Sequence, residues 1–146
     1  MTTPWRTAGH AAPWIAVALY AGLIAWISHI PNLAPPGNTP DWIMHVGEYG
    51  GLALLVSGAI GARHRTGPLA LTVGVAACLA FAVSDELHQS VVPGRSASVR
   101  DFAFDAIGLV VGLAAFAGWR AWRGRRIDVD RGAEPARPGP AARRRT

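Results

Sequence analysis

The chain has 146 residues, of which 51% are hydrophobic and only 16% are charged. A soluble domain usually carries about 25% charged residues, and this shortfall, with a positive mean hydropathy, indicates a membrane protein with room for one domain. The formal net charge of +5 comes from arginine, because lysine is absent, and nine of the fourteen arginines lie in the last 27 residues. That distribution is typical of a solvated tail beside a membrane, and it argues against a nucleic-acid-binding surface.

A first apolar run predicts a transmembrane helix over about residues 11–30. Residues 14–30 read WIAVALYAGLIAWISHI, and with the preceding alanines they reach the roughly 20 residues that cross a bilayer. The end of the run lacks the small-x-small pattern of a signal-peptide cleavage site, so we expect it to remain as the first span. Residues 1–10 form a short polar start before it.

A second span is predicted at about residues 42–62, just after a helix-start signal. Residues 39–41 read Thr-Pro-Asp, which supplies a capping hydroxyl, a proline suited to the first helical position and an acid near the positive end of the helix dipole. We expect Asp41 to act mainly as that dipole partner. His45 and Glu48 follow at i+4 and i+7, on the same helix face as Asp41.

Two further spans flank a polar hairpin. The third is predicted at about residues 68–92 and the fourth at about residues 101–122. Pro93 and Gly94 between them suit the central positions of a type II turn, because proline fixes a negative φ and glycine accepts a positive one.

Local patterns also predict a helix cap and two packing surfaces. Ser98-x-x-Asp101 ahead of the fourth apolar run resembles a capping box, in which a hydroxyl and a carboxylate satisfy the first backbone N–H groups of a helix. Glycines four residues apart predict close helix packing, at Gly47 and Gly51 in the second span and at Gly108 and Gly112 in the fourth.

The distribution of arginines predicts the orientation of the spans. With both termini in the cytoplasm, twelve arginines lie on the cytoplasmic side and only Arg95 and Arg100 on the outer side, which satisfies the positive-inside rule. We therefore predict an all-α, polytopic membrane protein with four transmembrane helices over residues 11–122 and cytoplasmic N- and C-termini. Residues 123–146 are rich in arginine and proline with little to bury, and we expect a disordered cytoplasmic tail.

In this orientation the polar side chains of the last three spans gather at their outer ends. Six of the nine acids lie there. Charged groups inside a membrane are costly, so they usually pair or face the interior of a helix bundle, and we expect Arg95 and Arg100 to pair with these acids. The candidate polar site comprises His45, Glu48, Tyr49, Asp85, Glu86, His88, Gln89, Arg95, Ser98, Asp101 and Asp105.

At these residues the chain resembles the VanZ-like family of small bacterial integral membrane proteins. The stronger block is Asp85-Glu86-x-x-Gln89 followed by Pro93-Gly94-Arg95, Ser98, Asp101 and Gly108-x3-Gly112, and the weaker is Asp41-x3-His45-x3-Tyr49. The resemblance covers about residues 14–119. The family commonly has lysine where this chain has Trp42 and asparagine where it has Asp105, so this version of the site is more acidic.

The resemblance implies a multi-pass protein of the bacterial cytoplasmic membrane with a role in the cell envelope. The namesake of the family is associated with low-level resistance to the glycopeptide teicoplanin. Because one fold can host many functions, the role must be argued from the site. Nothing in the sequence indicates an oligomeric state.

The residues leave three functions open. The site can bind a lipid-linked cell-wall precursor, a glycan headgroup or a glycopeptide, with Arg95 gripping a phosphate or carboxylate in a bidentate manner. It can instead support metal-assisted hydrolysis or transfer on a lipid-linked phosphate, since Asp, Glu and His are metal ligands. Finally, it can be a polar network that only braces the helix ends of a structural subunit or a small carrier.

Binding without catalysis is the preferred interpretation. His45-x-x-Glu48 is not a recognised ligand spacing, so we expect neither a metal nor another cofactor. A Ser–His–acid hydrolase built from Ser84, His88 and Asp85 is rejected, because all three lie on one short stretch without a nucleophile elbow.

Overall fold

The computed structural model describes residues 5–34, 36–37, 39–62 and 67–133. Over these ranges the chain forms helices and no strand. The helices are α1 (Trp5–Ser28), α2 (Asp41–Gly61), α3 (Pro68–Gln89) and α4 (Val99–Ala133). Each contains a stretch long and apolar enough to cross a membrane, namely Ala11–Ser28, Asp41–Gly61, Pro68–Gln89 and Val99–Ile127. The prediction of an all-α membrane protein with four spanning helices is confirmed.

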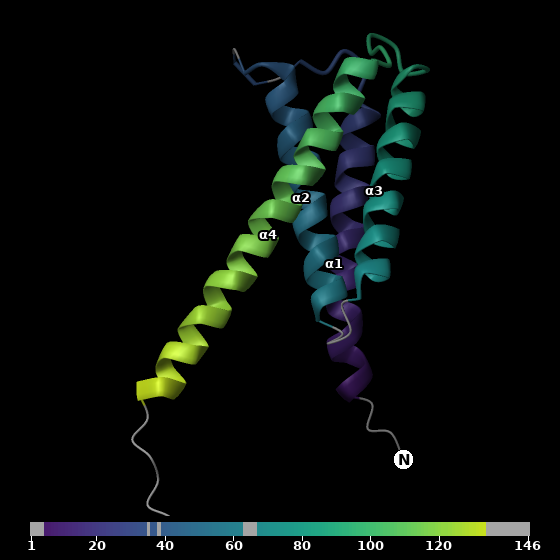
Figure 1. Cartoon of the computed structure of the whole chain (residues 1–146). Coiled ribbons are helices and arrows are strands. Elements are labelled where there is room, and N and C mark those ends of the chain that lie inside the picture. The colour runs from purple at the N-terminus through teal and green to yellow at the C-terminus, as the bar shows by residue number, and fades with distance from the viewer. Residues whose placement is uncertain (1–4, 35, 38, 63–66, 134–146) are drawn as a thin grey trace, which may run out of the picture. The chain divides into compact units, whose positions relative to one another are not determined.

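The chain divides into two compact units, residues 1–116 and residues 117–146, and α4 runs through both. The first unit holds α1, α2, α3 and the beginning of α4. In this unit α1, α2 and α3 run side by side, and the beginning of α4 passes across α2 (Figure 1). The polar residues of interest all lie in the first unit.

In the second unit, α4 continues to Ala133, so the prediction of a disordered tail from residue 123 was wrong as far as Ala133. The guanidinium of Arg123 lies 5.2 Å from the ring centre of Trp119, and that of Arg126 lies 4.3 Å from Trp122. Such contacts four residues apart stabilise a helix. Residues 134–146, the rest of the predicted tail, lie outside the described residues.

The helix ends differ from the predicted ones by a few residues. Helix α1 begins at Trp5, earlier than the predicted start at residue 11, and α3 ends at Gln89, before residue 92. At the start of α2, Pro40 occupies the N-cap and no side chain caps the helix, so the predicted Thr39 cap is not formed. The acid Asp41 does lie in the first turn, where the helix dipole favours it.

A tight turn joins α3 to α4 and is tied to the loop after α1. The backbone N–H of Arg95 donates to the carbonyl of Val92 over 3.1 Å, and Gly94 has a φ of 75°, as the predicted type II turn requires. The N–H of Asn32 donates to the carbonyl of Pro93 over 3.2 Å. This bond holds the two loops together at one end of the bundle.

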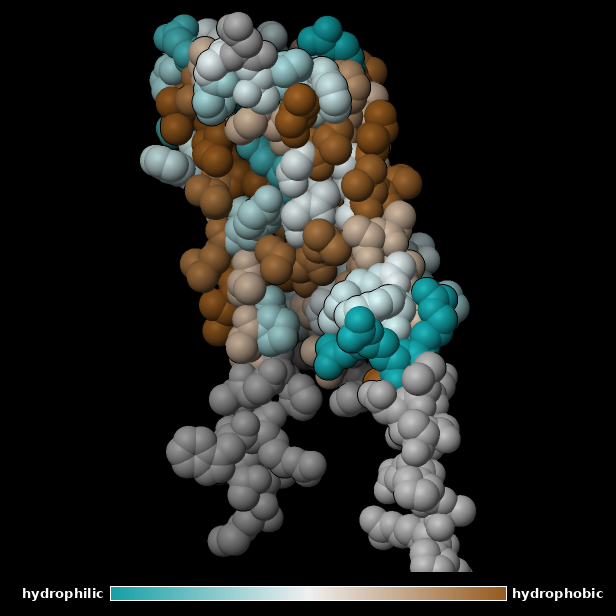
Figure 2. Space-filling model, turned by 90° about the vertical axis from the view of Figure 1, so that its left-hand side faces the viewer, coloured by the Kyte–Doolittle hydropathy of each residue, from teal (hydrophilic) through white to brown (hydrophobic). Residues whose placement is uncertain are grey.

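The interior and the surface of the bundle are both largely apolar. Buried hydrophobic side chains of all four helices form one cluster: Ile24, Tyr49, Leu52, Ala53, Cys78, Ala82 and Leu109. Large hydrophobic side chains such as Leu19, Leu69 and Val110 are also exposed, and the face in Figure 2 carries large brown areas between its ends. Such a surface is typical of a protein surrounded by hydrocarbon.

Helices α2 and α4 approach each other through glycine. A Cβ added at Gly108 would lie 2.6 Å from the carbonyl oxygen of Val46 and 3.1 Å from the backbone nitrogen of Gly50. One added at Gly112 would collide with the carbonyl of Gly50. Only hydrogen at these positions allows the two backbones to come so close, as small-x3-small packing requires.

The partner positions on α2 are shifted from the predicted pair. A Cβ at Gly47 would meet no atom within 4 Å, so the prediction of close packing at Gly47 was wrong, and Gly50 faces Gly108 instead. A Cβ at Gly51 would collide with the hydroxyl of Tyr20 in α1. The two sides of α2 therefore contact α4 and α1 through different glycines.

Candidate functional site

The polar side chains lie at the end of the bundle where α1 and α3 finish and α2 and α4 begin, the upper end in Figure 1. The structure separates them into two hydrogen-bonded groups. One joins α1 to α3, and the other joins α2 to α4 with a contribution from α3.

The first group links α1, α3 and the following turn. Ser28 Oγ donates to Asp85 Oδ2 over 2.8 Å, and Gln89 Nε2 donates to the same oxygen over 3.2 Å. Arg95 Nη2 donates to Gln89 Oε1 over 2.8 Å. Asp85 and Gln89 are one helical turn apart and share a face of α3. Through Gln89, the buried Asp85 therefore sets the position of the Arg95 guanidinium.

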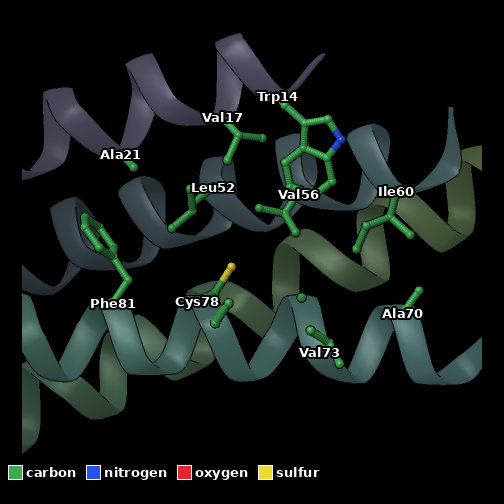
Figure 3. Close-up of a pocket in the computed structure, with 12 residues that line it drawn as sticks. Trp14, Val17, Ala21, Leu52, Val56, Ile60, Ala70, Val73, Cys78 and Phe81 are labelled. Carbon is green, nitrogen blue, oxygen red and sulfur yellow. The ribbon is translucent and has the colours of Figure 1, made fainter. Parts of the chain in front are cut away.

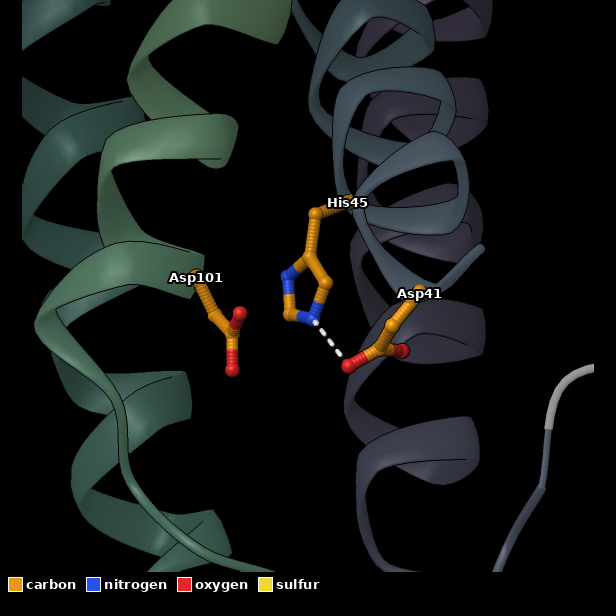
Figure 4. Close-up of side chains that lie close together, drawn as sticks. All are labelled: Asp41, His45 and Asp101. Atoms are coloured by element: carbon orange, nitrogen blue, oxygen red, sulfur yellow. Dashed lines mark ion pairs between the residues drawn. The ribbon is translucent and has the colours of Figure 1, made fainter. Parts of the chain in front are cut away.

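The second group is centred on His45 of α2. Its Nδ1 lies 2.8 Å from Asp105 Oδ1 of α4, and its Nε2 lies 4.0 Å from Asp41 Oδ2. Figure 4 shows the imidazole between Asp41, on its own helix, and Asp101, on α4. A carboxylate only accepts hydrogen bonds, so Nδ1 carries the hydrogen that faces Asp105. Asp105 is 1% exposed, and its contact with His45 is a buried link between α2 and α4.

At the start of α4, the predicted capping box is formed with a carboxylate from another helix, Glu86 of α3, in place of Asp101. The N–H of Asp101 faces Ser98 Oγ at 3.4 Å, so the hydroxyl half is formed within α4. The N–H of Ser98 donates to Glu86 Oε2 over 2.7 Å and not to the carboxylate of Asp101. Because Glu86 takes the place of the usual capping acid, the side chain of Asp101 is left to face His45.

Three buried carboxylate oxygens have no hydrogen-bond partner among the described residues: Glu86 Oε1, Asp101 Oδ1 and Asp105 Oδ2. The second oxygens of Glu86 and Asp105 are each held by one of the hydrogen bonds above. Buried polar atoms normally have partners, so such atoms point to something further that the site can hold.

A cavity of about 220 Å³ is lined by residues of both hydrogen-bonded groups, Ser28 and Arg95 of the first and His45 of the second. Its polar lining consists of Ser28, Asp41, His45, Glu48 and Arg95. Its apolar lining comes from the end of α1, the loop that follows and Met44 of α2. A cavity with an apolar wall and a few polar groups is typical of a ligand site.

A larger groove of about 970 Å³ lies between α1, α2 and α3, and Figure 3 shows it lined by side chains such as Trp14, Leu52 and Phe81. Its lining is almost entirely apolar. It therefore offers contact with hydrocarbon and lacks the polar groups that would fix a polar ligand.

Three further residues named in the sequence analysis make other contacts, and the prediction that Arg100 pairs with an acid is confirmed. His88 is exposed and stacks on His29 of α1, with 5.2 Å between the ring centres and 3.1 Å between His29 Nδ1 and His88 Nε2. Tyr49 is fully buried, and its hydroxyl has no hydrogen-bond partner in the described part of the chain. Arg100 Nε lies 3.7 Å from Asp101 Oδ1, with the Arg100 side chain 75% exposed.

Arg95 does not pair with an acid as predicted. Its hydrogen bond goes to the neutral amide oxygen of Gln89, and no carboxylate of the described residues forms an ion pair with it within 4.0 Å. The reason is that Asp85 already accepts hydrogen bonds from Ser28 and Gln89, while Glu86 caps α4. The guanidinium is left half-buried at the edge of the cavity.

Sequence reasoning missed Ser28 and His29, both at the end of α1. Each is a polar residue at the end of an otherwise apolar span, and that position could have marked them as partners for the polar end of the third span. Their partners Asp85 and His88 are 57 and 59 residues away.

The family model for VanZ/LLP1 matches residues 42–120, which is more than half of the chain. The chain belongs to the VanZ/LLP1 family. The matched region of this VanZ/LLP1 protein contains both halves of the His45–Asp105 contact and the whole hairpin between α3 and α4. Ser28 precedes the matched region. Searches of curated proteins and of solved structures returned no match.

Proposed function

We propose that this VanZ/LLP1 protein binds the anionic headgroup of a lipid-linked cell-envelope precursor, without catalysing a reaction on it. The surroundings of the Arg95 side chain are the main support for this proposal. The guanidinium has a neutral hydrogen-bond partner, lies at the edge of a cavity, and forms no ion pair within 4.0 Å with an acid of the described residues. Its remaining N–H donors match the paired oxygens of a phosphate or a carboxylate.

The cavity beside Arg95 suits an amphiphile. Ser28 and Glu48 offer polar atoms for the hydroxyl or amide groups of a glycan, while Ile27, Leu33 and Met44 offer an apolar wall. A lipid whose chain remains in the bilayer presents a headgroup at the depth of the helix ends. The combination supports a membrane lipid as the ligand over a freely soluble anion.

We further propose that this end of the bundle faces the outside of a bacterial cytoplasmic membrane, as the arginine distribution indicates. Cysteine introduced by Ser96→Cys, in the exposed turn after α3, should react with a membrane-impermeant maleimide in intact cells. Cysteine introduced by Ala62→Cys, at the opposite end of α2, should react only after the cells are broken. Both variants carry Cys78→Ala, which removes the single native cysteine. The reverse labelling pattern would place the cavity on the cytoplasmic side and contradict the proposal.

The role of Arg95 is tested by binding of a long-chain polyprenyl phosphate to the purified protein in nanodiscs. Arg95→Gln should weaken binding by at least about tenfold, because a hydrogen bond to a charged group is worth more than about 1.4 kcal/mol. Arg100→Gln is the matched control, since it removes the same charge from the same end but from a side chain that is 75% exposed. Equal loss in both variants would indicate a general charge effect and reject the role of Arg95.

The same variants connect the site to glycopeptide susceptibility. If the protein shields an envelope precursor by binding it, its expression in a sensitive bacterium should lower susceptibility to teicoplanin, and Arg95→Gln should abolish the effect while Arg100→Gln retains it. The measurement is the minimum inhibitory concentration at matched protein levels in the membrane. An unchanged value on expression of the wild-type protein would remove the resistance role for this family member.

A further inference from the structure

Two buried carboxylates from different helices lie close together, and one oxygen of each has no hydrogen-bond partner among the described residues. Glu86 of α3 is 7% exposed, and its Oε2 is held by the N–H of Ser98. Asp105 of α4 is 1% exposed, and its Oδ1 is held by His45 Nδ1. Ligand atoms of Glu86, Asp105 and His45 lie within 4.8 Å of one another. Both carboxylates are therefore fixed in orientation before anything binds.

Ion pairs of the described residues balance at most one of these two negative charges. Among those residues, Glu86 forms no ion pair within 4.0 Å, and Asp105 forms one with His45 when His45 is protonated. The nearby charged groups on α4 add a third carboxylate, Asp101, whose arginine partner is mostly exposed. Two ionised carboxylates at this depth need a compensating positive charge or a shared proton.

We propose that Glu86 Oε1 and Asp105 Oδ2 hold a divalent cation with a preference for oxygen ligands, in the class of Mg²⁺ and Mn²⁺. Such cations are bound by one or two carboxylates and complete their coordination with water and with phosphate oxygens. His45 acts as a positioning residue, because its bond to Oδ1 fixes the Asp105 carboxylate and leaves Oδ2 available to the cation, and hydrogen bonds commonly orient ligating carboxylates in this way. This departs from the expectation from sequence, in which no metal was anticipated.

The role of the cation rests on the proposed function. His45 both lines the cavity and contacts Asp105, so the cation would lie one side chain away from the headgroup. It would supply a second positive charge opposite Arg95 for a phosphate. No bond of the ligand is made or broken in this proposal.

The experiment measures Mn²⁺ binding to purified, chelator-treated protein in nanodiscs by the electron paramagnetic resonance signal of free Mn²⁺. We expect one tight site per chain, with Mg²⁺ as a competitor. Glu86→Gln and Asp105→Asn should each weaken the Mn²⁺ affinity by at least about tenfold. Removal of a side chain that only orients a metal ligand already lowers metal affinity by about that factor, and removal of the ligand itself should lower it at least as much. His88→Gln removes an exposed, ligand-type side chain at the same end from outside the cluster and the cavity, and it should retain the site.

Absence of Mn²⁺ binding to the wild-type protein would overturn the inference and favour a proton shared by the two carboxylates. Unchanged binding in both Glu86→Gln and Asp105→Asn would also overturn it. Helical circular dichroism shows whether each variant is folded, and the two variants on different helices give independent readings. Polyprenyl phosphate binding is measured on the same samples. If that binding persists without Mn²⁺ binding, only this inference fails; if Mn²⁺ binds and the lipid does not, the proposed function fails.

Discussion

Gly108→Ala is expected to weaken the bundle strongly, whereas Gly47→Ala is expected to leave it intact or stabilise it. A Cβ at Gly108 would lie 2.6 Å from the carbonyl oxygen of Val46 and 3.0 Å from its Cα. These are backbone atoms, which cannot rotate away as a flexible side chain can, so α2 and α4 would have to separate. Overpacking of this kind costs about 1–3 kcal/mol, and rigid neighbours favour the upper part of that range.

Gly47 provides the matched control on α2. A Cβ there would meet no atom within 4 Å, and alanine stabilises a helix by about 1 kcal/mol relative to glycine. Unfolding of both variants in mixed detergent micelles, followed by helical circular dichroism, measures the two effects with opposite signs. Equal stability of the two variants would contradict the close approach of α2 and α4.

Separation of α2 from α4 should also disturb the polar groups. Asp105 lies three residues before Gly108, on the same face of α4. A shift of the helix at Gly108 would therefore lengthen the 2.8 Å contact between Asp105 and His45. Gly108→Ala should thus affect ligand and cation binding together with stability, although Gly108 itself does not line the cavity.

Asp85→Ala is expected to destabilise the protein by about 3 kcal/mol, the second large effect. The buried carboxylate accepts from Ser28 at 2.8 Å and from Gln89 at 3.2 Å. A hydrogen bond to a charged group is worth about 1.5–3 kcal/mol, and its loss leaves buried donors without a partner. The loss should also release Gln89 and with it Arg95, so polyprenyl phosphate binding should fall in the fraction that remains folded.

Three further variants test this expectation for Asp85. Asp85→Asn keeps an acceptor oxygen and should lose less stability than Asp85→Ala. Asp41→Ala, at a side chain that is 51% exposed, should change stability by less than about 1 kcal/mol. A double-mutant cycle with Ser28→Ala should be non-additive, since the two residues share one bond. Additive losses would show that Ser28 and Asp85 are not coupled, and would contradict the link between α1 and α3.

Features within one helix or one turn could be read from the sequence. Four apolar runs of sufficient length predicted four spanning helices, because bilayer thickness sets the length of a span. Pro93-Gly94 predicted the turn, since few other residues accept the φ of 75° found at Gly94. The helix ends were less accurate, because caps can come from outside a helix, as the carboxylate of Glu86 does for Ser98.

The contacts between side chains of different helices could not be predicted from the sequence in this way. Helical periodicity establishes that Asp101 and Asp105 share a face, but not which neighbour that face meets. Each residue advances about 100° around a helix, so a small rotation replaces Gly47 by Gly50 at the contact with α4. The same rotation of α3 decides that Asp85 meets Ser28 while His88 stacks on His29.

The sequence by itself determined the all-helical membrane fold, the polar hairpin and the set of acids near it, because these follow from composition and local periodicity. Only the tertiary structure decided that Glu86 caps α4, that His45 meets Asp105 and that Arg95 lies beside a cavity with no carboxylate of the described residues within 4.0 Å. The physical reason is competition: each acid has several possible partners 12–60 residues away along the chain, and helix packing selects among them.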